Sequence, residues 1–76
     1  LHDSRVFLPS GGSIIIDQTH ALVVIDVNQG SCPGHLQANI EAASVIAREM
    51  RLRNLSGAIL VDFINMTKRT ERAQII

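Results

Sequence analysis

Two apolar stretches, Leu22-Val23-Val24-Ile25-Asp26 and Ala58-Ile59-Leu60-Val61-Asp62, decide the fold that we expect for this chain. Each is an aliphatic run that ends in an aspartate. Continuous runs of this length predict strands that are buried on both faces. An ionised carboxylate at the end of such a strand is costly unless something compensates its charge. The pair suggests a divalent cation site, but spacing alone slightly favours the alternative, in which the aspartates accept hydrogen bonds in turns.

Two shorter strands are expected before the first of these stretches. Residues 5–8 and 13–17 flank Pro9-Ser10-Gly11-Gly12, a strong turn signal, and are predicted to form a hairpin. The first apolar strand, over residues 21–27, follows after a short connection. Strands so close in sequence are expected to pair in an antiparallel manner.

A helix is predicted between the two apolar stretches, because the hydrophobic period changes there. Its expected buried face is an apolar stripe at helical spacing: Leu36, Ile40, Ala43, Ala47 and Met50. Glu49 and Arg53 have the i, i+4 spacing of a helical ion pair. Asn54 or Gly57 is expected to take the left-handed conformation that often ends a helix.

The fourth strand is predicted over residues 57–64, and Thr67 is expected to cap a last helix. The predicted fold is therefore α/β (α+β): three antiparallel strands, a long covering helix, a fourth strand and the start of a C-terminal helix. If the strands that carry Asp26 and Asp62 are parallel, both acids lie at one edge of the sheet, where open α/β sheets place ligands.

Composition narrows the class of protein. The chain has 76 residues, a hydrophobic fraction of 46% and a formal net charge of zero, which argue against disorder and against a dedicated basic nucleic-acid tether. No apolar run approaches the roughly 18 residues of a membrane span. Cys32 is the sole cysteine and cannot form an internal disulfide, so a cytoplasmic location is expected.

Three segments together resemble the ribonuclease E/G family of bacterial endoribonucleases. They are residues 8–17 (LPSGGSIIID), residues 21–28 (ALVVIDVN) and residues 39–66, which run from NIEAA through RLRNLSG to VDFINM. The resemblance implies that residues 1–76 are one unit, the core of the family's DNase I-like catalytic subdomain. It implies metal-dependent hydrolysis of single-stranded RNA in RNA processing and decay, by an enzyme that forms homo-oligomers at full length.

The resemblance also implies a site. Asp26 and Asp62 would coordinate the catalytic Mg²⁺, or Mn²⁺ in its place, and Asn28 would support them. The loop after Asn28 is shorter than in the family, so RNA contacts carried there are expected to be missing. We therefore expect the isolated chain to cleave RNA poorly or not at all.

Lys68 and Arg69 fall in the first turn of the expected last helix, where the helix dipole disfavours cations unless an anion is near. Bound RNA phosphate would be such an anion, and two solvated charges are an equal alternative.

Two other function classes stay open from the sequence. A ribonuclease H-like two-metal nuclease would need further carboxylates, and the glutamates available are Glu41, Glu49 and Glu71. In a non-catalytic α/β interaction module, the two aspartates would only cap turns.

Overall fold

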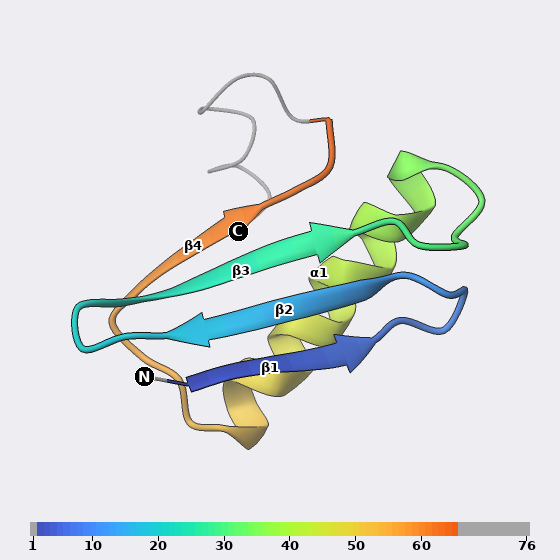
Figure 1. The fold of residues 1–76 in the computed structure, drawn as a ribbon. Helices are drawn as coiled ribbons and strands as arrows, with labels where there is room; N and C mark the ends of the chain where they lie inside the picture. Colours follow the sequence, from blue (N-terminus) through green and yellow to red (C-terminus); the bar gives the residue numbers. More distant parts are fainter. Residues whose placement is uncertain (1, 66–76) are drawn as a thin grey trace.

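The structure, a computed structural model, describes residues 2–65, with side chains from residue 4 onward. Its elements in chain order are β1 (His2–Phe7), β2 (Ser13–Gln18), β3 (Leu22–Asn28), α1 (His35–Leu52) and β4 (Ala58–Asp62). The four strands form one sheet in the order β1-β2-β3-β4. The helix α1 runs across one face of this sheet (Figure 1).

The pairing of the strands agrees with the expected α+β fold. β1, β2 and β3 are antiparallel to their neighbours, and β4 lies parallel to β3. The strand-helix-strand crossover through α1 therefore puts the ends of β3 and β4 at the same edge of the sheet. The expected cap at Thr67 and the last helix lie outside the described residues.

Glycines let the β1–β2 turn pack against the loop that follows β3. The Leu8 N–H donates to the Gly12 carbonyl at 2.8 Å and closes the turn. A Cβ atom on Gly12 would lie 2.7 Å from the Asn28 carbonyl oxygen, so only glycine fits there without a shift. The Ser31 N–H donates to the Gly11 carbonyl at 3.3 Å and joins the two loops.

The hydrophobic core lies between the sheet and α1. Alternate strand residues point into it, as expected for a pleated strand with one covered face. The buried members are Leu8, Ile14, Ile16, Val23, Ile25, Val27, Ala42, Val45, Ile46, Leu55, Val61 and Phe63. The largest of the almost fully buried side chains are Ile14, Ile16, Ile25 and Val61.

The expectation that the apolar strands are covered on both faces is wrong for the described residues. In β3, burial alternates, with Val23, Ile25 and Val27 buried and Asp26 exposed. We call the sheet face opposite α1 the open face. Its positions are Arg5, Phe7, Ser13, Ile15, Asp17, Leu22, Val24, Asp26, Asn28, Ala58, Leu60 and Asp62. An apolar run favours burial of both faces of a strand, but a second layer must be present to cover the second face. The described residues contain a single helix, which covers one face.

The expected buried face of the helix is only partly confirmed: Ala43 and Met50 pack against the core, and the other members of the stripe are exposed. The buried residues of α1 are Ala38, Asn39, Ala42, Val45 and Ile46. Leu36 and Ile40, from the expected stripe, are 72% and 57% exposed. The helix carries apolar residues on more than one side, and its two buried alanines present little bulk to the sheet.

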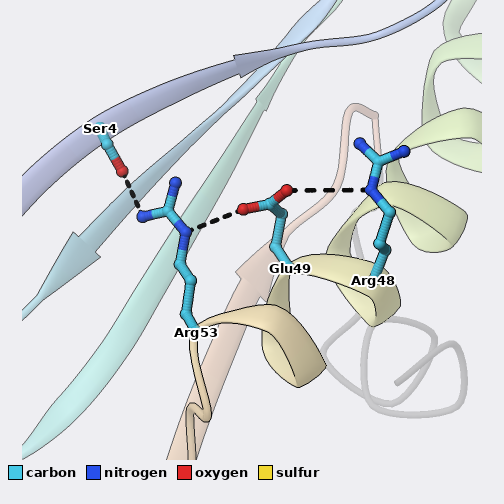
Figure 2. Close-up of polar contacts among 4 residues, drawn as sticks. All are labelled: Ser4, Arg48, Glu49 and Arg53. Atoms are coloured by element: carbon cyan, nitrogen blue, oxygen red, sulfur yellow. Dashed lines mark hydrogen bonds and ion pairs between the residues drawn. The ribbon is translucent and has the colours of Figure 1, made fainter.

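The end of α1 is tied to β1 by a polar chain (Figure 2). The Arg53 Nε donates to the Glu49 Oε1 at 2.8 Å, which confirms the expected ion pair. A second nitrogen, Nη1, donates to the Ser4 hydroxyl at 2.6 Å. Asn54 and Gly57, with φ of 56° and 81°, both take the expected left-handed conformation between α1 and β4.

Within residues 2–65, no helix combines the length and the hydropathy that crossing a bilayer requires.

Candidate functional site

The structure brings Asp26 and Asp62 together. They are paired residues of the parallel strands β3 and β4, so their Cα atoms are neighbours across the sheet. Strand spacing puts such neighbours about 4.8 Å apart, and in-register side chains point to the same face. Both residues are exposed on the open face. Two carboxylates at this separation can share one cation.

The strand β3, expected over residues 21–27, continues past Asp26 and ends at Asn28. Because strand side chains alternate, Asn28 lies on the same face as Asp26, two residues farther along the strand. This confirms the condition on which the supporting role of Asn28 depends. It also weakens the turn interpretation of Asp26, since the residue lies inside a paired strand.

A buried asparagine on the helix fixes the chain just beyond Asp62. The Asn39 Nδ2 donates to the Ile64 carbonyl at 2.9 Å, and the Ile64 N–H donates back to the Asn39 Oδ1 at 2.9 Å. Asn39 is 7% exposed, so these bonds are made away from bulk water. The amide thus holds the exit of β4 against α1. Sequence analysis did not identify Asn39. The signal that could have found it is its spacing: Asn39 and Ala42 are three residues apart, so they lie on the same side of the helix.

Glu41 fixes the loops beside Asn28. Its Oε1 accepts the Ser10 N–H at 3.0 Å, and its Oε2 accepts the Ser10 hydroxyl at 2.5 Å and the Gln37 amide at 2.7 Å. The Cys32 thiol lies 3.8 Å from Oε1. The Ser10 hydroxyl bond, followed by those from Gln37 and the Ser10 N–H, lowers the pKa of Glu41 below its ordinary 4.5. Sequence analysis considered Glu41 only as a possible ligand in the ribonuclease H-like alternative and missed this role.

The residues of the site fit a hard divalent cation. Mg²⁺ is commonly held by one or two carboxylates and completes its octahedral shell with water and substrate phosphate. The described part of the chain offers no group of three or more His, Cys, Asp or Glu side chains that could enclose a metal. An ion at Asp26 and Asp62 would thus keep open positions for water and phosphate.

The ribonuclease H-like alternative needs further carboxylates as metal ligands, and the described helix places none on the open face. Glu41 and Glu49 belong to α1, which lies across the sheet from the open face (Figure 1). Glu41 is bonded to Ser10, and Glu49 is bonded to Arg53. Glu71 and the expected RNA contacts Lys68 and Arg69 lie outside the described residues.

Comparison with known proteins places the chain. It matches the Ribonuclease E/G family over residues 1–76. It is 52% identical to ribonuclease E of Nostoc sp. over 95% of this chain, and 43% identical to ribonuclease G of Escherichia coli over 97% of this chain. The chain spans 12% of the length of the first relative and 17% of the second. This protein chain therefore belongs to the ribonuclease E/G family.

Proposed function

We propose that this chain is the catalytic core of a Mg²⁺-dependent endoribonuclease that hydrolyses single-stranded RNA. One observation supports this most. Asp26 and Asp62 of this chain are cross-strand neighbours on the open face. The chain that carries them belongs to the ribonuclease E/G family. Relatives at 52% and 43% identity carry the names ribonuclease E and ribonuclease G.

Each residue of the site has a part in this proposal. Asp26 and Asp62 would hold the ion through their carboxylates at the sheet edge. When bound, the ion stabilises negative charge on the scissile phosphate and lowers the pKa of a coordinated water. The Asn28 amide, on the same face, orients a carboxylate or a water by hydrogen bonding. Mn²⁺ prefers the same oxygen ligands and is expected to substitute.

The wider assignment concerns the protein to which these residues belong. The chain spans a small part of its relatives, so the grip on RNA is proposed to involve parts outside residues 2–65. We place the enzyme in RNA processing and decay, in the cytoplasm, as a homo-oligomer at full length. The unpaired thiol of Cys32 agrees with a reducing compartment.

Cleavage under single-turnover conditions tests the proposal. The chain is placed in excess over an end-labelled single-stranded oligoribonucleotide, with Mg²⁺ or with EDTA. We expect slow cleavage that requires Mg²⁺ and is abolished in Asp26→Asn and in Asp62→Asn. A chimera of Escherichia coli ribonuclease G, with this chain in place of its matching segment, raises the sensitivity. Metal-independent cleavage, or an inactive chimera with an intact fold, would contradict the proposal.

A non-catalytic interaction module is the second candidate, and exposed apolar side chains favour it. Leu36 is 72% exposed and Ile40 is 57% exposed on α1, and Leu60 is 57% exposed on the open face. Such side chains suit contacts with another surface. A module of this kind needs no metal, so a chain that does not respond to Mg²⁺ or Mn²⁺ would support it.

A further inference from the structure

One row of residues crosses all four strands of the sheet at the candidate metal site. Arg5 pairs with Ile15, Ile15 with Asp26, and Asp26 with Asp62. In-register neighbours share a face, so Arg5 lies on the open face with both acids, two strands or about 10 Å from Asp26. We propose that Arg5 and Phe7 of β1 bind the nucleotide next to the scissile phosphate. This inference rests on the proposed function.

Arg5 is held in place to meet a phosphate. Its Nη1 donates to the Ser13 hydroxyl at 2.9 Å, and Ser13 is buried at 4% exposure. Ser13 is in turn the cross-strand partner of Asn28. The guanidinium is therefore anchored one strand away from Asn28, on the face that carries the acids. A guanidinium has five N–H donors, so the bond to Ser13 leaves donors for a bidentate contact with phosphate.

The helical arginines lack this arrangement. Arg53 is engaged by Glu49 and Ser4, and Arg48 lies 3.9 Å from the same glutamate (Figure 2). Among the described residues, Arg5 is the one Lys or Arg on the open face. The structure gives it no carboxylate partner within the described part of the chain.

Phe7 supplies a surface for a base. It lies two residues after Arg5 on the same face and is 72% exposed. Its cross-strand partner is Ser13, so Phe7, Ser13 and Asn28 form the row beside that of Arg5 and the acids. Proteins that bind single-stranded RNA combine such exposed aromatic rings with cations that contact the backbone.

The charge of the open face indicates that RNA would bind there together with a metal ion rather than alone. The open face carries Asp17, Asp26 and Asp62 besides Arg5, so in the absence of a cation it repels phosphate. A divalent ion at the acid pair reverses the local charge. Binding through Arg5 and Phe7 is thus expected to require the divalent ion. Single strands are favoured, since a base must be unstacked to lie on Phe7.

Binding of a labelled oligonucleotide to matched variants tests this inference. The probe is a fluorescent, single-stranded 2′-O-methyl oligoribonucleotide, and its anisotropy is followed with Mg²⁺ and with EDTA. We expect Arg5→Gln and Phe7→Ala each to weaken binding about tenfold in Mg²⁺. Arg5→Lys is expected to restore part of the affinity. Arg51→Gln is the control, because it makes the same change of charge on α1, and it should bind like the unaltered chain.

A parallel measurement separates this inference from the proposed function and from misfolding. Mn²⁺ broadening of NMR signals is recorded for the unaltered chain and for Arg5→Gln. If Mn²⁺ acts on Asp26 and Asp62 in both, yet the two bind RNA equally, the role of Arg5 is refuted and the metal site stands. If Mn²⁺ affects neither acid in the unaltered chain, the proposed function fails, and the present inference fails with it.

Mapping on the unaltered chain needs no variant to fold. With Mg²⁺ present, the oligoribonucleotide should shift the NMR signals of Arg5 and Phe7 together with those of Asn28. Shifts confined to α1 would overturn the inference.

Discussion

The candidate site is defined by two carboxylates that face each other across neighbouring strands. Like charges at directly opposed sheet positions destabilise the pairing. Asp26 and Asp62 hold such positions at the end of β4, on the exposed face. An arrangement that costs stability, such as two facing carboxylates, is typical of functional sites. The metal-free chain is therefore expected to be less stable than it would be with one charge removed.

We predict that Asp26→Asn raises the free energy of unfolding in EDTA by about 0.2–1 kcal/mol, because it removes the repulsion between the two carboxylates. Urea denaturation measures this change. With saturating Mg²⁺ the order should reverse, because only the unaltered chain gains stability from binding the ion. A variant that is less stable than the unaltered chain in EDTA would show that Asp26 has a structural partner instead.

At the scale of the elements, α1 acts as a frame for the ends of the strands. Asn39 holds the chain after β4, and Glu41 holds the β1–β2 turn and the loop after β3. The β1–β2 turn and the loop after β3 lie at the edge of the sheet where Asp26 and Asp62 are found. The helix lies on the far face, so it positions the site without contributing a ligand (Figure 1).

Asn39→Ala should lower the free energy of unfolding by about 1–3 kcal/mol, because it leaves the polar backbone groups of Ile64 without partners. Urea denaturation gives this quantity, and amide hydrogen exchange at Ile64 should become faster. The control is Ser44→Ala on the exposed side of α1, for which we expect a change within about 0.5 kcal/mol. Equal effects of the two substitutions would argue against the proposed hold on β4.

The stability of the chain should depend on the charge of Glu41. Hydrogen bonds from Ser10 and Gln37 lower its folded-state pKa below 4.5, so the ionised form favours folding. This contribution is complete above the unfolded-state pKa and is lost as the pH falls through the folded-state value. Glu41→Gln should therefore unfold at a lower temperature at pH 7, and the gap to the unaltered chain should narrow below about pH 4.5.

Thermal unfolding of both chains across the acid range measures this gap. The remaining carboxylates titrate in both and cancel in the difference. A gap that stays constant with pH would mean that the ionisation of Glu41 does not stabilise the fold.

The sequence was sufficient for some elements and insufficient for others. The apolar runs, the turn at Pro9 to Gly12 and the spacing of Glu49 and Arg53 are local patterns. The structure confirms the strands, the turn and the ion pair, but not the expected cover on both faces of the strands. The parallel pairing of β3 and β4 was considered only as a condition, and the structure shows that it holds. The predicted buried face of α1 was wrong for Leu36, Ile40 and Ala47. Several sides of the helix carry apolar residues, and packing against the sheet determines which side is buried.

The supporting contacts of the site were invisible for a related reason. Asn39 reaches Ile64 across 25 residues, and Glu41 reaches Ser10 across 31. No periodic pattern marks such a contact, since it depends on how the helix is placed on the sheet. The proximity of Asp26 and Asp62 was expected for parallel strands, because both acids follow runs of the same kind in a strand-helix-strand unit. The expected contacts of Lys68 and Arg69 stay predictions.

Considered as a whole, the described molecule is one sheet with one covering layer, and the candidate site lies on the other face. Phe7 on β1 and Leu60 on β4 are 72% and 57% exposed on that face. A chain of 76 residues buries only about 60% of its unfolded surface, so its stability is expected to be modest. Binding of an ion at the acid pair would then make a visible contribution to the stability of the molecule.

The central claim is that Asp26 and Asp62 bind one divalent ion between them, and a Mn²⁺ titration followed by NMR tests it most directly. We predict paramagnetic broadening centred on both aspartates, with one site per chain, that Mg²⁺ displaces and that Asp26→Asn or Asp62→Asn alone removes. Broadening centred elsewhere, or broadening that persists at full strength in either variant, would contradict the claim.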